Sequence, residues 1–421
     1  MTNTLNRLGS ANTYDTAISN ISARQSALSN LQENLTSGKK VVRASDDPTG
    51  AAQAERAMTR ISRIATDQRA LGSQRDSIAQ AESTLGDVTT ALQSFRELVV
   101  SAGSGIQTAA DRTTIAQQLA GLRDQIFSSA NSKDANGLPL FSALGSALAP
   151  FVGPRSPPQD YTFNGLPGQT SSSEVSIPFA LDGDSAFMLQ VARDGVYNIS
   201  TSGPSAISAS PLAVNVAPTT PPTAVTDSSY KISITAVGPG TLPGTSTATY
   251  NLQETTTAVP PVTTTQVGLQ STNYPSGALP IASIPGRTVT ITGTPTSVDT
   301  IAIAPSPSLF SVLDNAVRNI GSAPSSAAAT QAVSQALGNI DIGMGRVSAA
   351  RGHAGDLLNR ADTISANQGA RSIQLEADRS SAEDLDMVKG ISDFQKAQTG
   401  YQAALQSYAQ VQKLSLFNYI G

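Results

Sequence analysis

Cysteine and tryptophan are absent from this chain of 421 residues, and histidine occurs once, at His353. Without cysteine the chain can form no disulfide, no thiolate metal site and no cysteine nucleophile. A single histidine without cysteine partners does not make a structural zinc site, and no His-Glu-x-x-His motif is present. We interpret His353 as an ordinary helical histidine, because Arg351-Gly-His353-Ala carries no nucleophile signal. The sequence therefore predicts a protein that is not an enzyme and has no metal site and no cofactor.

Aromatic residues are few, at 5% of the chain, and no run of about 18 apolar residues exists. The apolar residues are mostly Ala, Val, Leu and Ile, so we expect thin helical seams rather than one thick core. The net charge of −4 and pI of about 5.1 argue against nucleic acid as a partner, which calls for a clustered basic face. The first residues lack the apolar region of a secretory signal. We expect no membrane span, and either a cytoplasmic protein or export without a cleaved signal.

Two apolar stripes lie at the ends of the chain, and their residues are spaced alternately by four and three positions. This spacing places each stripe along one face of a helix, with Gln25, Gln32 and Gln398 at intervening steps. A narrow stripe is not buried by a lone helix. We therefore expect the first and last helices to pair with each other and with copies from other subunits. The apolar members of these terminal stripes are Tyr14, Ile18, Ile21, Leu28, Leu35, Met387, Ile391, Phe394, Tyr401, Leu405 and Tyr408.

Helical patterns flank the middle of the chain on both sides. The first helix is predicted over residues 13–36 and the last over residues 383–420, with Ser380 and the acidic residues after it as cap and first turn. Asp47 followed by Pro48 reads as an N-cap and first helical residue, and it opens a long helix that ends near Ala102. Its apolar residues repeat every seven positions. Further helices are expected to close near residue 131, over residues 310–320, and over residues 333–375.

The residues from about 145 to 307 have a different composition, rich in Thr, Ser, Pro and Gly and poor in charge. Apolar residues alternate with polar ones over residues 175–181, 230–234, 289–291 and 301–303, which predicts half-buried strands. We interpret the proline-rich residues 217–222 and residues 254–265 as loops or edge segments, because proline cannot donate to a strand ladder. The sequence thus predicts a β-rich insert between helical halves.

The predicted fold class is α+β: an elongated, coiled-coil-like helical bundle built from both termini, with the β-rich insert as a distal domain. Three domains are expected. The terminal helical assembly domain comprises residues 1–40 and 381–421, the helical rod domain residues 41–145 and 308–380, and the outer domain residues 146–307.

Several segments resemble bacterial flagellins and their relatives. Leu35-Thr-Ser-Gly-Lys-Lys-Val-Val-Arg-Ala-Ser-Asp-Asp-Pro48 is similar to the loop after the first flagellin helix, and Ala382-Glu-Asp-Leu-Asp-Met387 to the start of the last one. Residues 130–142, 149–151, 161–165, 301–306 and 414–420 look more like the members of this superfamily that join hook to filament. Pro139 and Ala143 stand where that pattern usually has a Tyr and a Gly, and residues 203–280 do not match it.

The resemblance implies a structural protein of the flagellar axis that polymerises through its terminal helices. It implies export by the flagellar type III apparatus, an extracellular location, and contacts with other copies, with a neighbouring hook-associated junction protein and with flagellin. A cytoplasmic export chaperone would hold the C-terminal helix beforehand. Arg43, Asp46 and Asp47 belong to the loop between the first two helices that carries part of the resemblance.

Two other functions remain open from the sequence. A filament-forming flagellin would assemble in the same way but be made in great excess over a junction protein. A secreted adhesin with a coiled-coil stalk, using the β-rich insert as its binding lobe, would instead be a stable monomer or trimer with ordered termini.

Overall fold

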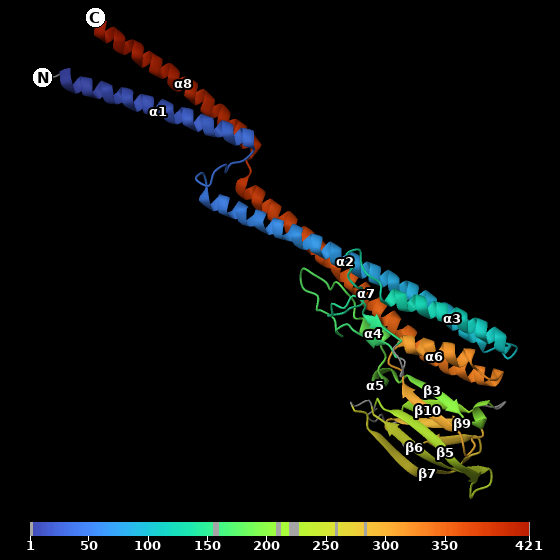
Figure 1. Cartoon of the computed structure of the whole chain (residues 1–421). Helices are drawn as coiled ribbons and strands as arrows, with labels where there is room; N and C mark the ends of the chain where they lie inside the picture. Colours follow the sequence, from blue (N-terminus) through green and yellow to red (C-terminus); the bar gives the residue numbers. More distant parts are fainter. Residues whose placement is uncertain are drawn as a thin grey trace. The chain divides into compact units, whose positions relative to one another are not determined.

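The computed structural model describes residues 3–154, 160–207, 212–218, 227–256, 260–281 and 284–420, with the side chains of residues 3–14, 206–207, 218 and 411–420 excepted. Long helices from the two halves of the sequence and a β-rich insert make up the chain (Figure 1). The predicted α+β class is confirmed. The helices are α1 (Asn3–Ser37), α2 (Pro48–Ala102), α3 (Ala109–Ala130), α4 (Gly183–Phe187), α5 (Val191–Asp194), a 3-10 turn (Pro204–Ile207), α6 (Leu309–Gly321), α7 (Ser326–Glu383) and α8 (Met387–Ile420).

Two compact units divide the chain, and each is described by itself. One unit contains residues 1–69 and 365–421, and the other contains residues 70–364. These boundaries fall inside α2 and α7, so each of these two helices contributes residues to both units. The predicted division into three domains stays a prediction.

The sequence predicts the start of α2 correctly because its signals are local. Asp47 Oδ1 accepts hydrogen bonds from the backbone N–H groups of Thr49 and Gly50, at 3.1 and 3.0 Å, and Pro48 opens the helix. Two other predicted helix starts are wrong. α1 begins at Asn3, ten residues before the predicted start, and α8 begins at Met387, because Asp386 rather than Ser380 accepts from its first free N–H groups.

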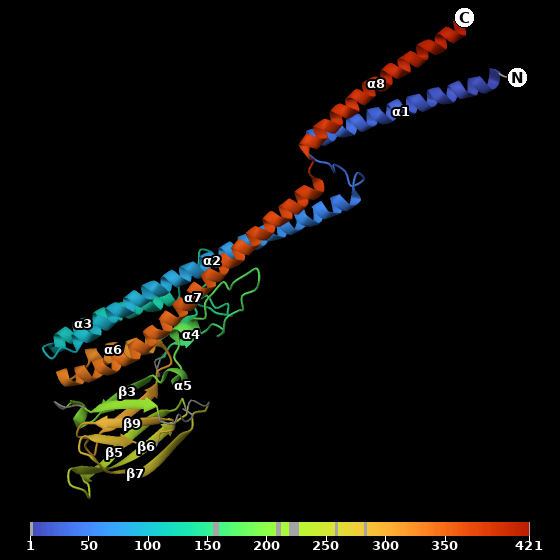
Figure 2. The same cartoon turned by 180° about the vertical axis from the view of Figure 1, so that it is seen from behind.

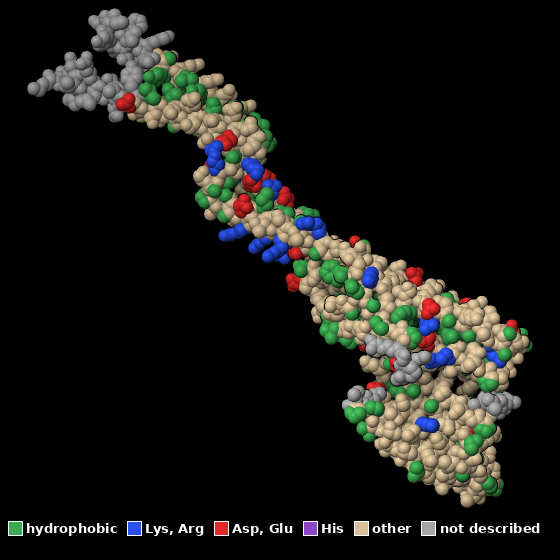
Figure 3. All heavy atoms as spheres, in the orientation of Figure 1, with side chains coloured by type: hydrophobic (Ala, Val, Ile, Leu, Met, Phe, Trp, Pro, Cys, Tyr) green, Lys and Arg blue, Asp and Glu red, His purple; other side chains and the backbone are tan. Residues whose placement is uncertain are grey.

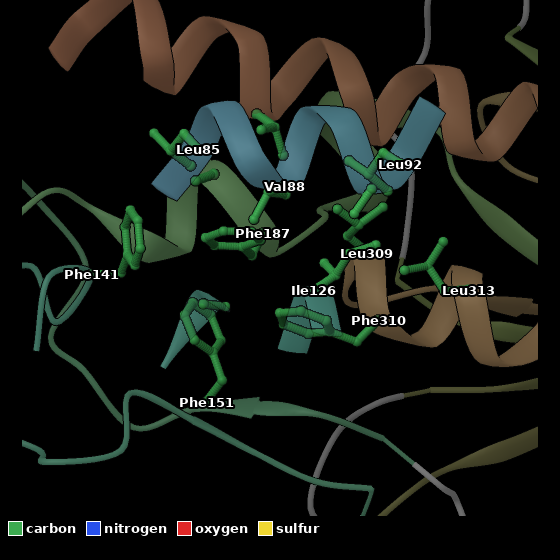
Figure 4. Packing of buried hydrophobic residues seen from close by; sticks show 14 of the residues in the cluster. Leu85, Val88, Leu92, Ile126, Phe141, Phe151, Phe187, Leu309, Phe310 and Leu313 are labelled. Atoms are coloured by element: carbon green, nitrogen blue, oxygen red, sulfur yellow. The ribbon is translucent and has the colours of Figure 1, made fainter. Parts of the chain in front are cut away.

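The unit of residues 70–364 contains a helical core. The seven-residue repeat of α2 is buried throughout this core, and α3 packs against α6. Figure 4 shows side chains from α2, α3, α4 and α6 converging with Phe141 and Phe151 of the segment between α3 and α4. The labelled residues of this core are Leu85, Val88, Leu92, Ile126, Phe141, Phe151, Phe187, Leu309, Phe310 and Leu313.

Phe310 lies at the centre of an aromatic cluster within that core. Its ring centroid lies 5.2–5.6 Å from those of Phe127, Phe151, Tyr161 and Phe187. Aromatic pairs at this separation add to the free energy gained by burial. The expectation of thin seams alone is therefore wrong for this unit, because its few aromatic residues gather at one place.

The β-rich insert forms two antiparallel sheets that enclose a second core. Strand order is β3-β10-β5-β6-β7 in the larger sheet and β4-β9-β8 in the smaller, and β1 pairs with β2 separately. The alternating residues of β5, β9 and β10 are buried as predicted. The strands are β1 (Phe151–Val152), β2 (Thr162–Phe163), β3 (Tyr197–Ser202), β4 (Ala213–Pro218), β5 (Ser229–Pro239), β6 (Thr245–Thr255), β7 (Thr263–Pro275), β8 (Ala278–Ile281), β9 (Arg287–Thr292) and β10 (Thr300–Pro305).

The strand predicted over residues 175–181 is wrong. This segment is irregular; Ile177 and Leu181 are buried while Val175 and Phe179 are exposed. The Ile177 N–H donates to Oε1 of Gln74 on α2, at 3.1 Å, so a helix side chain takes the place of a neighbouring strand. Residues 217 and 218 end β4, which is an edge strand of the smaller sheet, in agreement with the expectation of a loop or edge segment there; residues 219–222 lie outside the described residues. Strands β6 and β7 also extend into the segment 254–265, where β7 forms a sheet edge.

Candidate assembly site

The candidate site is the terminal helix pair, which consists of α1 and α8 within one compact unit. The two helices, which come from opposite ends of the sequence, lie side by side in both views (Figures 1 and 2). On α8 a row of alternating small and aromatic residues is buried or half-buried, while most of the residues on either side of it are exposed. This contact row consists of Gly390, Phe394, Ala397, Tyr401, Ala404 and Tyr408.

The α1 side of the pair is aliphatic. Ala17, Ile21, Leu28, Leu31 and Leu35 are half-buried at helical spacing. The small residues of α8 let this surface come close. A Cβ atom placed on Gly390 would lie 3.1 Å from Leu35 Cδ2 and 2.9 Å from Leu385 Cδ2. A residue larger than glycine at position 390 would therefore fit only if Leu35 and Leu385 moved.

The terminal stripes predicted from the sequence divide into two groups in the structure. Six of their members face the partner helix and are half-buried: Ile21, Leu28, Leu35, Phe394, Tyr401 and Tyr408. Four others are exposed: Ile18 at 52%, Met387 at 46%, Ile391 at 47% and Leu405 at 41%. The side chain of Tyr14 lies outside the described residues. The exposed members leave apolar surface along α8 after the two helices have paired, and their role between subunits stays a prediction.

Sequence reasoning missed the small residues of the pair. Gly390, Ala397 and Ala404 repeat every seven positions and take the place in the contact that was assigned to Ile391, Gln398 and Leu405. A prediction based on hydrophobicity instead selects larger side chains one residue further along the helix, such as Ile391 and Leu405. The contact row could have been predicted from the regular repeat of small residues beside regularly spaced aromatic residues, because small residues allow two helices to approach closely.

The loop after α1 is fastened to the connection between α7 and α8. The Lys40 N–H donates to the Glu383 carbonyl at 2.8 Å, and the Leu385 N–H donates to the Gly38 carbonyl at 2.9 Å. Lys39 forms an ion pair with Glu383, which also accepts from Arg379 at 3.1 Å. Gly38 has a φ angle of +71°, a conformation that favours glycine. These bonds hold the loop after α1 against the end of α7 and the residues just before α8.

Arg43, Asp46 and Asp47 order the loop by local hydrogen bonds. Asp46 Oδ2 accepts from the Arg43 N–H at 2.8 Å, and the Arg43 guanidinium pairs with Glu33 of α1 at 2.7 Å. The Thr49 hydroxyl donates to Asp47 at 2.6 Å, and this bond lowers the pKa of the Asp47 carboxyl. Because these groups are exposed, their ion pair adds little stability, and their arrangement is that of a structured turn rather than a catalytic site.

No group of three or more His, Asp or Glu side chains that could hold a metal ion occurs in the part of the chain that the structure describes. Within the same residues, no helix is both long enough and apolar enough to cross a membrane. His353, on α7, is exposed. The notable chemistry of the candidate site is therefore apolar surface on paired helices, which suits protein–protein contact.

Sequence comparison agrees with this architecture at both ends. The bacterial flagellin N-terminal helical region matches residues 10–145, and the bacterial flagellin C-terminal helical region matches residues 337–420. The matched segments contain most of α1 with all of α2 and α3 on one side, and most of α7 with all of α8 on the other. The chain belongs to the flagellin family.

Among curated relatives, the chain is similar to flagellar hook-associated protein 3. It is 36% identical to that protein of Salmonella typhimurium over 148 residues, which is 34% of this chain and 46% of the relative. It is 38% identical to the Escherichia coli protein over 122 residues, which is 28% of this chain and 38% of the relative. The alignments therefore span less than half the length of these relatives.

Solved structures share the fold. The flagellar junction protein FlgL from Legionella pneumophila superposes with a TM-score of 0.55 at 21% identity, covering 74% of this chain and 99% of that one. FlgL of Xanthomonas campestris superposes with a TM-score of 0.52 at 23% identity, covering 78% of this chain and 99% of that one.

Proposed function

We propose that this protein is a structural component of the bacterial flagellum that forms the junction between hook and filament. The observation that carries the proposal is the terminal helix pair, which keeps Met387, Ile391 and Leu405 exposed on α8 after pairing with α1. Exposed apolar residues aligned on a helix suit burial against further copies of the same helices. The similarity to flagellar hook-associated protein 3, over 148 and 122 residues, supports the junction rather than another position.

The proposed partners follow from that position. Copies of this chain would contact one another in a ring or a short helical layer through their terminal helices. A neighbouring hook-associated junction protein would lie on one side of this layer and flagellin on the other. Before export, a cytoplasmic chaperone would cover the apolar side of α8. Neither nucleic acid nor a membrane is a proposed partner, and the chain acts as a structural element rather than an enzyme.

The proposed location is extracellular, on the flagellum, after export without a cleaved signal. Assembly outside the cell requires that the terminal helices pass through the export channel and pair afterwards. The pair suits this order, because a narrow two-helix contact has no thick core and is marginal without its neighbours. Edman sequencing of the protein taken from purified flagella should therefore return the encoded N-terminus.

Immunogold labelling of flagella tests the position. Antibodies against the β-rich insert should label the hook–filament boundary and leave the filament bare. Labelling along the whole filament would instead identify a filament-forming flagellin, which shares the terminal helices; the Escherichia coli flagellin is 32% identical over 130 residues. Absence of label from flagella would reject a flagellar role altogether.

A further inference from the structure

A cleft of about 420 Å³ lies beside β3, within the unit of residues 70–364. One wall consists of the consecutive residues 199–203, and the opposite wall comes from α6, α7 and the turn between them. β3 is an edge strand of the larger sheet and lies on the side of the insert that faces α6 (Figures 1 and 2). Side chains alternate between the two faces of a strand, so a run of consecutive residues lines a cleft along the strand edge. We call this space the edge cleft.

The backbone groups that β3 turns toward the edge cleft follow from its pairing with β10. The Ser306 N–H donates to the Val196 carbonyl at 3.2 Å, and the register of the pair is regular from there on. In an antiparallel pair, residues alternate between bonding to the neighbouring strand and pointing away from it. Every second residue from Val196 therefore bonds to β10, and Ile199 and Thr201 turn their N–H and C=O groups away from it. Among the described residues, no partner is bonded to these outward groups.

α7 presents a row of side-chain amides to this edge. Asn339, Gln335 and Gln331 are spaced by four residues, which places them on one face of the helix. Asn339 Nδ2 donates to the outward carbonyl of Tyr197 at 3.1 Å, so the amides and the strand edge meet at one end. Four residues of helix rise about 6 Å and two residues of strand about 6.6 Å, so the amides follow the outward groups in step. Gln335 and Gln331 line the edge cleft, and neither has a hydrogen-bond partner within the described chain.

The edge cleft is polar but uncharged. The described residues that line it include no Asp, Glu, Lys or Arg, and they offer side-chain amides, hydroxyl groups and the peptide groups of β3. Figure 3 shows few charged side chains on the face of the insert in view. Burying a charge without a partner is costly, whereas amides both donate and accept hydrogen bonds. The edge cleft therefore suits a neutral ligand that is rich in hydrogen-bonding groups.

We propose that the edge cleft binds an extended peptide segment of another protein, one without charged side chains. The segment adds a strand beside β3, so its backbone pairs with the outward N–H and C=O groups of Ile199 and Thr201 on one side. On its other side it bonds to the amides of Gln335 and Gln331. Both sets of groups, which have no partner within the described chain, are then satisfied. The inference goes beyond the proposed function and does not depend on the position of the protein in the flagellum.

A peptide explains the edge cleft better than a neutral sugar does. An extended peptide turns an N–H and a C=O group toward the same side at every second residue, which is the period of the outward groups of β3. The amides on α7 repeat over nearly the same distance. A sugar could use single amides and hydroxyl groups but has no reason to match this period.

Hydrogen exchange on the purified full-length protein locates the contact. Random ten-residue peptides displayed on phage are selected on the protein, and an enriched peptide, which should lack charged residues, is synthesised as the probe. The probe should slow exchange of the Ile199 and Thr201 amides by about tenfold, while the Ser200 and Ser202 amides, already bonded to β10, should change little. Failure to enrich any peptide, enrichment of charged peptides, or unchanged exchange at Ile199 and Thr201 would overturn the inference.

Two substitutions at Thr201 separate backbone pairing from side-chain contact. Thr201→Pro removes the outward N–H and leaves the bonds to β10 in place, which an edge strand tolerates. It should lower the affinity for the probe by about tenfold. Thr201→Val keeps the N–H and should bind as the wild type does. Wild-type affinity in the proline variant would overturn the added strand, and so would an equal loss in both variants.

A double variant tests the opposite wall and keeps the question decidable if the proline variant does not fold. Gln331→Ala/Gln335→Ala should lower the affinity for the probe by about tenfold. Asn359→Ala/Asn367→Ala is the matched control, because it removes two exposed amides of α7 outside the edge cleft. Equal affinity of the two double variants would overturn the inference.

Other occupants of the edge cleft give different results. Protection of the Ile199 and Thr201 amides by maltohexaose, and by none of the selected peptides, would assign the edge cleft to a neutral sugar. Dimerisation of the wild-type chain that Gln331→Ala/Gln335→Ala abolishes, without enrichment of any peptide, would assign it to a second copy. Either result would overturn the peptide as the ligand.

Discussion

Ala143 adopts a φ angle of +56°, in the left-handed region that side chains other than glycine rarely occupy. Two backbone hydrogen bonds hold it there: its N–H donates to the Leu181 carbonyl at 3.1 Å, and the Leu144 N–H donates to the Leu166 carbonyl at 3.0 Å. The family resemblance of the sequence implies a preference for glycine at this point of the Leu-Phe-Ser segment, where this chain has alanine. The structure gives a physical reason for that preference, because glycine enters this region without steric cost.

We therefore expect Ala143→Gly to stabilise the protein. Removing the strain of the left-handed conformation should stabilise the folded state by about 1–2 kcal/mol. The greater conformational entropy of glycine in the unfolded chain should offset about half of this gain. The free energy of unfolding should rise by about 0.5–1 kcal/mol, measured by urea denaturation. Ala349→Gly, inside α7, is the control and should lower stability by a similar amount, because glycine weakens a helix interior. A loss of stability in Ala143→Gly would show that the strain is absent.

Asp194 joins the short helix α5 to α7 inside the larger unit. Its side chain is 2% exposed, and its Oδ1 accepts from Nε of Arg346 at 2.7 Å. Burial by itself raises the pKa of Asp194, but hydrogen bonds from Arg193, the Gln190 N–H and Arg346 outweigh it and hold the pKa below its ordinary value. The folded state therefore favours the charged carboxylate.

The sign of this shift predicts a pH dependence. Because the pKa of Asp194 is lower in the folded state, its carboxylate stabilises the fold at pH values above its pKa in the unfolded chain, which is about 3.9. This contribution is lost as the pH falls through the pKa of Asp194 in the folded state. Asp194→Asn should cost about 1–3 kcal/mol at pH 7, because Arg346 loses its charged partner. The difference in free energy of unfolding between the variant and the wild type should become smaller toward pH 3. Chemical denaturation at both pH values measures it, and a difference that stays constant between them would contradict the prediction.

At the scale of the element, α8 presents two surfaces that the amino-acid pattern alone merges into one. The contact row of small and aromatic residues faces α1, while Ile391 and Leu405 stay exposed one position away from it and Met387 stays exposed three positions before Gly390. Because these positions adjoin the contact row without entering it, a helix can use both surfaces at once. One serves the pair within the chain, and the other is free for the assembly proposed above.

Leu405→Asp tests this separation. The side chain is already 41% exposed in the single chain, so the folded chain should lose less than about 1 kcal/mol. Burying the new charge between subunits would cost several kcal/mol per contact, so the variant should not join flagella, and cells should swim poorly and shed flagellin. Thermal melting and a motility assay measure the two effects.

Gln406→Asp is the control, because Gln406 is exposed and lies beside the apolar residues rather than among them. This variant should assemble and swim normally. Normal swimming of Leu405→Asp, or equal failure of Gln406→Asp, would show that the exposed apolar residues of α8 are not an assembly surface.

At the scale of the whole molecule, the chain holds separate cores whose residues come from different parts of the sequence. The helical core draws on α2, α3, α6, α7 and the segment between α3 and α5, and the second core lies between the two sheets of the insert. Both belong to the unit of residues 70–364. The insert leaves and rejoins the helical part at adjacent points, since the Ser306 N–H donates to the Val196 carbonyl at 3.2 Å.

This adjacency predicts that the insert can be removed cleanly. Replacing residues 197–305 by a short Gly-Ser linker should leave the helical core folded, because nearly all members of the second core lie within the excised range. The shortened protein should keep its helical circular dichroism and still reach flagella, with melting lowered by only a few degrees. A truncation that removes residues 203–280 is the contrast, since it leaves β9 without β4 and β10 with β3 as its only neighbour, and it should aggregate. Loss of helix in the clean excision would show that the insert supports the helical core.

The sequence by itself determined the features that depend on local or periodic signals. The start of α2 follows from Asp47 and Pro48, its buried face from a repeat of seven, and the strands β5, β9 and β10 from strict alternation. Resemblance at the loop after α1 and at the start of α8 indicated the family. Each of these signals depends on residues within a few turns of one another, so no knowledge of distant neighbours is needed to read it.

Only the tertiary structure decided which apolar residues face which neighbour. Gly390, Ala397 and Ala404 form the contact with α1 although they are less hydrophobic than Ile391 and Leu405, because close approach of two helices depends on side-chain size as well as on hydrophobicity. Residues 175–181 alternate like a strand, yet Gln74 of α2 holds them in an irregular path. In both cases the deciding partner lies far away in the sequence, and its position exists only once the chain has folded.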